Sequence, residues 1–373
     1  MRIAQIAPLI ESVPPKLYGG TERIVSYLTE ALVQAGHQVT LFASGDSLTS
    51  AELVPCSERA LRLDPTMRDP LPHYTVMLDR VRRRAAEFDA LHFHIDYLHF
   101  PLFRDLAGRT LTTQHGRLDL ADLAVAYRAF PEFPLVSISD DQRRPCPDWH
   151  WLRTIHHGLP ADLYPFAPLP RGGYLAFLGR ICPEKRPDHA IDIARRAGVR
   201  LKIAAKVDRV DQTYFDEVIR PLLRDPLIEY VGEIGERDKA AFLGGARGLL
   251  FPIDWPEPFG LVLIEAMACG TPVIAYRRGS VPEVIDDDWT GFIVDDVAGA
   301  VAAVAKLECL DCGAVRARFE QRFTAKRMAN DYLTAYHSLA AALELPLMTP
   351  VLDYDITGAR STDGEGIGAA HAA

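Results

Sequence analysis

Short apolar runs alternate with longer segments of helical periodicity along this chain, beginning at its first residues. Residues 2–7 form an apolar run, residues 21–34 carry apolar side chains at helical spacing, and residues 38–43 are apolar again. Residues 90–94 and 110–114 also predict short strands. Strands joined through helices pair in parallel and are covered by helices on both faces. The first part of the chain therefore predicts a doubly wound α/β domain.

The same alternation starts again after a stretch at residues 159–173 that contains four prolines and reads as a linker. The later pattern predicts strands at residues 174–178, 201–205, 229–231, 248–251 and 271–275, and helices at residues 187–197 and 260–269. A second doubly wound α/β domain is therefore expected, with a cleft between the two.

These patterns divide the chain into four parts. We expect an N-terminal Rossmann-like domain at residues 1–165, a C-terminal Rossmann-like domain at residues 166–320 and helices at residues 321–347. Residues 348–373 are rich in small and polar side chains without periodicity, so we expect a disordered tail there.

The amino-acid composition argues against several classes of function and partner. The chain has 373 residues, and 41 Lys and Arg against 50 Asp and Glu give a net charge of −9, which disfavours nucleic acid and anionic lipid as main partners. We see no apolar stretch of ~20 residues that would span a membrane and no secretory signal. Six scattered cysteines, with Cys309 and Cys312 in an isolated C-x-x-C pair, indicate a reducing cytoplasm. A cytoplasmic protein is expected, and a monomer is favoured.

Two glutamates, Glu257 and Glu265, stand eight positions apart around the start of a predicted helix. A ligand at this helix start would meet both carboxylates and the backbone N–H groups of Phe259, Gly260 and Leu261. Carboxylates accept hydrogen bonds from hydroxyls in pairs, which suits a sugar or a ribose. The spacing alone also fits two glutamates that merely decorate a loop and a helix.

Basic residues and paired glycines mark two strand ends. Arg180 and Lys185 flank the turn after the strand at residues 174–178, at the sheet edge where α/β folds bind ligands. Cations there can neutralise a leaving diphosphate, although a solvated basic loop has the same pattern. Gly19 and Gly20 open the first strand-to-helix turn and would admit a phosphate close to the backbone. They do not form a G-x-G-x-x-G fingerprint, which weakens a dinucleotide interpretation.

Histidines mark the ends of two further strands. His115 could bind a hydroxyl in the cleft, although a lone histidine is more often structural. His92 and His94 alternate along the preceding strand, and we expect packing or cleft lining rather than metal binding. The D-x-D patterns at residues 286–288 and 353–355 do not follow an apolar strand, so no metal site is expected.

Taken in this order, the segments resemble retaining glycosyltransferases of family 4, which have the GT-B fold of two Rossmann-like domains facing a central cleft. The resemblance covers roughly residues 1–340. It rests on Glu257 and Glu265 with Pro258-Phe259-Gly260 between them, on Gly179-Arg180 with the following Lys185, and on residues 279–294 with Pro282-Glu283-Val284.

The resemblance implies a role for each matching residue. Arg180 and Lys185 would hold the donor diphosphate, together with Gly19, Gly20 and the amides of Phe259, Gly260 and Leu261. Glu265 would bind the ribose, and Glu257 and His115 would face the transferred sugar as catalytic residues. The base would lie beside Val231, Gly232, Glu233 and Ile234.

The resemblance also implies the reaction. A hexose, with glucose as the best guess, would move from a nucleoside-diphosphate sugar, with UDP as the best guess, to a hydroxyl acceptor. Attack from the face of the departing phosphate would retain the anomeric configuration, and no metal or other cofactor would be needed.

The acceptor is less defined. The segment Tyr18-Gly19-Gly20-Thr21-Glu22-Arg23 resembles a bacterial branch that includes glucosyltransferases of small soluble acceptors such as pterins. Family members with lipid acceptors often use a basic helix, so the arginine-rich run Arg80–Arg84 keeps a weak peripheral membrane contact open against a solvated helix face. Soluble acceptors are favoured.

Other functions compete with this interpretation. A dehydrogenase would need the glycine fingerprint and an acidic residue after the second strand, where Ala43-Ser44-Gly45 stands instead. A sugar-nucleotide epimerase and a non-catalytic nucleotide-sugar-binding protein of the same fold remain alternatives. The base, the linkage and the oligomeric state are left open by the sequence.

Overall fold

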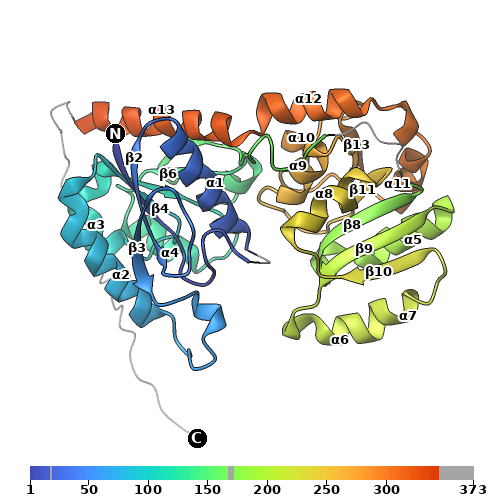
Figure 1. Ribbon diagram of the computed structural model, residues 1–373, viewed down its shortest axis with the longest axis horizontal. Coiled ribbons are helices and arrows are strands. Elements are labelled where there is room, and N and C mark those ends of the chain that lie inside the picture. Colours follow the sequence, from blue (N-terminus) through green and yellow to red (C-terminus); the bar gives the residue numbers. More distant parts are fainter. Residues whose placement is uncertain (17–18, 167–171, 344–373) are drawn as a thin grey trace, which may run out of the picture.

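A computed structural model describes residues 1–16, 19–166 and 172–343 of the chain, which form two α/β domains (Figure 1). The strands of the first domain are β1 (Arg2–Ile6), β2 (Gln38–Ser44), β3 (Glu52–Ser57), β4 (Ala90–Phe93), β5 (Thr110–Thr113), β6 (Leu135–Ser137) and β7 (Trp151–Thr154). They pair in parallel in the order β3-β2-β1-β4-β5-β6-β7. All carboxyl ends of these strands therefore meet at one edge.

The second domain repeats this plan. Its strands are β8 (Tyr174–Arg180), β9 (Arg200–Lys206), β10 (Ile228–Gly232), β11 (Gly248–Phe251), β12 (Val273–Tyr276) and β13 (Gly291–Val294). They also pair in parallel, in the order β10-β9-β8-β11-β12-β13. The predicted doubly wound α/β fold is confirmed in both parts of the chain.

Helices connect the strands. In the first domain they are α1 (Gly20–Gln34), α2 (Leu71–Arg84), α3 (Phe100–Phe103) and α4 (Leu123–Ala129). In the second domain they are α5 (Pro187–Ala197), α6 (Gln212–Tyr214), α7 (Arg220–Leu222), α8 (Glu236–Gly244), α9 (Leu261–Ala268), α10 (Val281–Val284) and α11 (Val297–Val304). The chain then forms α12 (Cys312–Arg322) and α13 (Ala325–Leu343).

Most predicted elements are present with bounds shifted by one or two residues, and α5 and β11 have the predicted bounds. The sequence pattern did not predict β3, β6, β7 and β13. β3 and β7 are the two edge strands of the first sheet, and most of their side chains are only partly buried, so their apolar signal is weak. β6 has only three residues.

The last helix returns from the second domain to the first. Figure 1 shows α13 lying along the first domain beside α1, while α12 lies over the second domain. Tyr332 and Tyr336 of α13 are fully buried, and Arg327 donates to the carbonyl oxygens of His156 and His157 at 2.8 Å each. The C-terminal helix is thus part of the first domain's core.

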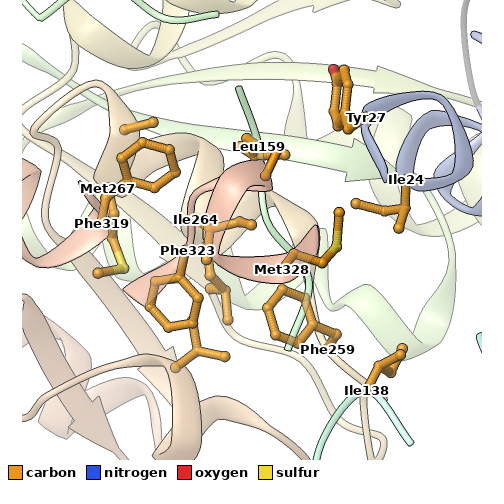
Figure 2. Packing of buried hydrophobic residues seen from close by; sticks show 14 of the residues in the cluster. Ile24, Tyr27, Ile138, Leu159, Phe259, Ile264, Met267, Phe319, Phe323 and Met328 are labelled. Carbon is orange, nitrogen blue, oxygen red and sulfur yellow. The ribbon is translucent and has the colours of Figure 1, made fainter. Parts of the chain in front are cut away.

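An apolar cluster joins the two domains (Figure 2). It contains Ile24 and Tyr27 from α1, Ile264 from α9 and Met328 from α13. Phe259, which lies just before α9 in the second domain, has its ring centroid 6.2 Å from that of Phe323. The residues before α9 are therefore held in the apolar core that the two domains share.

Part of the expected linker is packed rather than free. Leu159 and Tyr164 are buried, and Leu159 forms a bridge with Thr324. Tyr18 and two of the four linker prolines, Pro168 and Pro170, lie outside the described residues. The whole of the tail expected at residues 348–373, with its D-x-D pattern, also lies outside them.

Candidate active site

A cavity of about 440 Å³ lies between the domains at the carboxyl ends of both sheets. Twelve of the fourteen residues predicted for the site line it: Gly19, Gly20, His115, Arg180, Lys185, Glu233, Ile234, Glu257, Phe259, Gly260, Leu261 and Glu265. Val231 and Gly232 end β10 and are not among the lining residues. The structure thus gathers residues that are up to 246 positions apart, from Gly19 to Glu265.

Glu257 lies on the loop between β11 and α9 and is largely buried. Its Oε2 atom pairs with the Nζ atom of Lys185 and accepts a hydrogen bond of 2.8 Å from the indole N–H of Trp255. The Lys185 ammonium also lies 5.3 Å from the Trp255 ring centroid and 5.5 Å from that of Phe251. The sequence identified Glu257 and Lys185 separately; the structure shows them as an ion pair whose ammonium lies close to two aromatic rings.

The turn after β12 fixes the loop that carries Glu257. The Ser280 amide donates to the Glu257 carbonyl at 3.0 Å, and the Ser280 hydroxyl donates to the Phe259 carbonyl at 2.8 Å. Gly279 has a φ of 53°, and a Cβ atom there would lie 2.4 Å from the backbone N and O of Glu257. Only glycine allows this approach.

The helix start predicted before Glu265 is present. Gly260 caps α9 with a φ of 78°, so the chain turns sharply from Phe259 into the helix at Leu261. The first N–H groups of a helix have no acceptor within it, and they carry its positive dipole end. Because these groups line the cavity with Arg180 and Lys185, an anion would find both kinds of positive group there.

Arg180 ends β8 and pairs in register with Lys206, the last residue of β9. Both side chains contact Asp208, Arg180 at 3.2 Å and Lys206 at 2.9 Å. Burial works against the Asp208 charge, but Lys206 and Arg180 outweigh it and hold the pKa of this carboxyl below its usual value. Across the cleft, Gly20 approaches Leu261, since a Cβ atom at Gly20 would lie 3.7 Å from its Cδ1 atom.

Glu265 is buried on α9 and accepts a bond of 2.7 Å from the Lys239 ammonium. Lys239 also lies 3.3 Å from Glu236, which in turn pairs with Arg23 of the first domain and accepts from Tyr164. Although burial opposes it, Lys239 and Arg23 keep the pKa of Glu236 below its usual value. The sequence did not predict Lys239 and Arg23 as lining residues, although Arg23 stands only three positions after the paired glycines.

His115 follows β5 and is half-buried at the cavity wall. Its Nε2 atom lies 2.9 Å from Nδ1 of His94, and its ring stacks on that of His157 with centroids 5.3 Å apart. Burial lowers the pKa of His115 to about 3, so the ring is neutral near neutral pH. His157, which also lines the cavity, was not predicted; it lies just before the segment at residues 159–173 that was interpreted as the linker.

His92 and His94 are buried and form hydrogen bonds to protein groups. His92 contacts the Tyr336 hydroxyl at 2.8 Å and the Thr113 hydroxyl at 2.7 Å, while His94 contacts Gln5 at 2.8 Å. Within residues 1–16, 19–166 and 172–343, no cluster of three or more His, Cys, Asp or Glu side chains is arranged to hold a metal ion.

The arginine-rich run on α2 is engaged with neighbouring groups. Arg80 donates to the Pro55 carbonyl, Arg82 pairs with Asp105, Arg83 with Asp79 and Arg84 with Glu87.

Across the helices that the structure describes, none combines the length and apolar character that crossing a membrane requires. Asp286, in the D-x-D pattern at residues 286–288, pairs with Arg318 and Arg322.

Comparisons with known proteins cover both domains. The model of "Glycosyltransferase Family 4" matches residues 18–178, and that of "Glycosyl transferases group 1" matches residues 169–324. The chain is 32% identical to a D-inositol 3-phosphate glycosyltransferase of Kribbella flavida, over 87% of this chain and 92% of that protein. It is 26% identical to a glycogen synthase of Mycobacterium tuberculosis, over 86% and 89%.

Another match is shorter. A D-inositol 3-phosphate glycosyltransferase of Saccharomonospora viridis is 31% identical over 50% of this chain, and the match spans only 45% of that protein.

Solved structures share the fold at low sequence identity. AviGT4, described as a glycosyltransferase involved in avilamycin A biosynthesis, has a TM-score of 0.71 at 22% identity, covering 91% of this chain and 98% of its own. Anabaena HepE, described in complex with UDP and glucose, has a TM-score of 0.68 at 17% identity, covering 91% and 100%.

Proposed function

This chain belongs to the glycosyltransferases of family 4, and we propose that it moves a hexose from a nucleoside-diphosphate sugar to a hydroxyl acceptor with retention of configuration. The observation that carries the proposal is the composition of one cavity. It combines Arg180, Lys185 and the start of α9, which suit a diphosphate, with Glu257 and Glu265, which suit hydroxyls.

The ion pair of Lys185 and Glu257 suggests how a donor would be received. A diphosphate would compete for the Lys185 ammonium, and Glu257 would then be available to the sugar. Charge that develops on the leaving phosphate would be stabilised by Arg180, Lys185 and the amides of residues 259–261, so we propose that no metal is required. Glu265 would accept hydrogen bonds from the ribose hydroxyls.

For the chemical step, the bond between the anomeric carbon and the phosphate oxygen breaks, and a bond to the acceptor oxygen forms on the same face. The phosphate oxygen accepts the acceptor's proton. Glu257 stabilises the positive charge that develops on the sugar, and His115 binds one of its hydroxyls.

We propose UDP-glucose as the donor, with the base beside residues 231–234. The description of HepE in complex with UDP and glucose supports this choice. For the acceptor we propose a small soluble molecule: the relatives named for inositol 3-phosphate support this, and the arginines of α2 are engaged with protein groups. The six cysteines are free thiols, which supports a cytoplasmic setting.

Calorimetric titration with UDP, GDP and ADP in EDTA tests the nucleotide site. We expect micromolar binding of one nucleotide that Arg180→Ala abolishes and that Arg209→Ala, an exposed neighbour outside the cavity wall, preserves. Failure of all three nucleotides to bind would contradict the proposal.

A second assay separates the competing functions. Incubation of the protein with the matching sugar nucleotide alone should leave the sugar unchanged, whereas an epimerase would alter it. Addition of a panel of hydroxyl acceptors should release the nucleoside diphosphate and form a glycoside. Binding without turnover on any acceptor would favour a non-catalytic nucleotide-sugar-binding protein.

A further inference from the structure

A chain of buried polar side chains leads from the C-terminal helix to His115. Tyr336 of α13 accepts a hydrogen bond of 3.1 Å from the Gln5 amide nitrogen. The Gln5 carbonyl oxygen lies 2.8 Å from Nε2 of His94, and Nδ1 of His94 lies 2.9 Å from Nε2 of His115. Gln5, His94 and Tyr336 are each no more than 3% exposed, so water does not compete for these bonds.

The chemistry of these groups determines the direction of each hydrogen bond. The Gln5 oxygen can only accept, so Nε2 of His94 carries a proton. Burial and the neighbouring His92 and His115 keep the pKa of His94 well below its usual value, and a neutral imidazole carries only one proton. Nδ1 of His94 is therefore an acceptor, and Nε2 of His115 is the donor to it.

This assignment leaves Nδ1 of His115 without a proton. The atom is buried, and no group among the described residues forms a hydrogen bond with it. His115 lines the cavity, so the missing donor can come from a bound substrate. A hydroxyl can supply such a donor, whereas a carboxylate cannot.

The Tyr336 hydroxyl holds the Gln5 amide in this orientation. With its oxygen accepting from Gln5, the hydroxyl can donate its own proton to Nδ1 of His92, at 2.8 Å, and His92 in turn contacts Thr113 at 2.7 Å. In this arrangement the hydroxyl accepts from Gln5 and donates to His92. Without the Tyr336 hydroxyl, the Gln5 amide could rotate by about 180°, and its nitrogen would then donate to His94. The donor and the acceptor would be exchanged in both the Gln5–His94 and the His94–His115 hydrogen bonds.

We propose that Tyr336 is a positioning residue that acts through Gln5 and His94 to keep the His115 proton on Nε2, so that Nδ1 accepts a hydrogen bond from a hydroxyl of the transferred sugar. The inference rests on the proposed function for the role of the sugar. The arrangement of protons can be measured without any substrate. It also couples the C-terminal helix to the catalytic cleft, and it selects a donor sugar with a hydroxyl rather than a carboxylate at this position.

Nitrogen NMR of histidine-labelled protein tests the proton arrangement directly, with His115→Asn used to assign the signals. We expect protonated Nε2 and unprotonated Nδ1 at His115 in the unmodified protein. In Tyr336→Phe, which removes only the hydroxyl, we expect a second His115 species protonated at Nδ1. Tyr332→Phe is the matched control, because it removes a buried hydroxyl from the same helix that contacts Thr113 at 2.9 Å and not Gln5. It should leave one species.

Kinetics give the second readout once a donor and an acceptor are identified. We expect Tyr336→Phe to lower kcat about five- to tenfold, with less than about a twofold change in the donor KM, as for loss of one hydrogen bond in the transition state. Gln5→Leu cuts the same link from the other side and serves if Tyr336→Phe does not fold.

A His115 ring protonated at Nδ1 in the unmodified protein would overturn the inference, as would a single unchanged species in both Tyr336→Phe and Gln5→Leu. If the spectra are as expected but no glycosyl transfer is found, the proposed function fails and the proton arrangement stands.

Discussion

Glu257 is held by two side chains before any substrate is present. Lys185 neutralises its charge and the Trp255 indole donates to the same oxygen, so one oxygen of the carboxylate has two partners. The Trp255 contact does not depend on charge, whereas the Lys185 contact does. A substitution that keeps the first and removes the second therefore isolates the role of the negative charge.

Glu257→Gln makes this separation. The glutamine oxygen can still accept from Trp255, but it cannot stabilise a positive sugar, and we expect kcat to fall by about 10²-fold or more. UDP should bind as tightly as before or more tightly, because Lys185 no longer has to leave an ion pair. Steady-state kinetics and calorimetry measure the two effects.

Asp254→Asn is the matched control for Glu257→Gln. Asp254 is three positions away and half-exposed, and it pairs with Arg186 and Arg278 outside the cavity wall. Turnover should stay close to that of the unmodified protein. Equal turnover in Glu257→Gln and Asp254→Asn would remove Glu257 from the mechanism.

At the scale of elements, the turn between β12 and α10 supports the loop between β11 and α9. A methyl group at Gly279 would overlap the Glu257 backbone, and the φ of 53° at Gly279 is unfavourable for other residues. Gly279→Ala should therefore displace Glu257 and lower kcat by about 10²-fold, because small misplacements at a reacting centre are costly.

The matched control for Gly279→Ala is Gly173→Ala, since a Cβ atom at Gly173 would meet no atom within 4 Å. Its kcat and thermal midpoint should be nearly unchanged. A Gly279→Ala protein with full activity would show that this turn does not set the position of Glu257.

The elements that position the site could be predicted from the sequence to different extents. The start of α9 and the end of β8 were found because glycine and an apolar run mark them locally. Lys239 was missed because its partner Glu265 is near only in the folded chain. Trp255 stands two positions before Glu257, but the sequence does not indicate that its indole N–H points to that carboxylate. A tryptophan in a loop and a lysine on a helix carry no local signal for such contacts.

At the scale of the molecule, the alternating pattern predicted two domains and a cleft but not the contacts between them. Glu283 of the second domain accepts from the backbone amides of Asp140 and Asp141 at 2.7 Å each and contacts His156 at 3.1 Å. Arg23 of the first domain pairs with Glu236 of the second. These pairs depend on how the domains face each other, which periodicity within one segment does not encode.

Acid stability is a property of the whole fold that follows from its buried histidines. Burial lowers the pKa values of His92, His94, His99 and His157 well below the usual 6.5, and that of His115 to about 3. The unfolded chain takes up protons on these rings below pH about 6.5 while the folded chain does not, so stability is lost as the pH falls. Each ring lowers the free energy of unfolding by up to about 1.4 kcal/mol per pH unit in this range.

We therefore expect the thermal midpoint to fall steadily between roughly pH 7.5 and pH 5.5, as calorimetry in matched buffers would show. Glu22, whose pKa is raised by burial, acts in the opposite direction but only as the pH nears the carboxyl range. His99→Phe provides the control, because the His99 ring stacks on Phe93 with centroids 3.7 Å apart and does not line the cavity. His99→Phe should reduce the change of the thermal midpoint with pH by the contribution of one histidine. A thermal midpoint of the unmodified protein that does not change with pH would contradict the conclusion that the buried histidines are neutral.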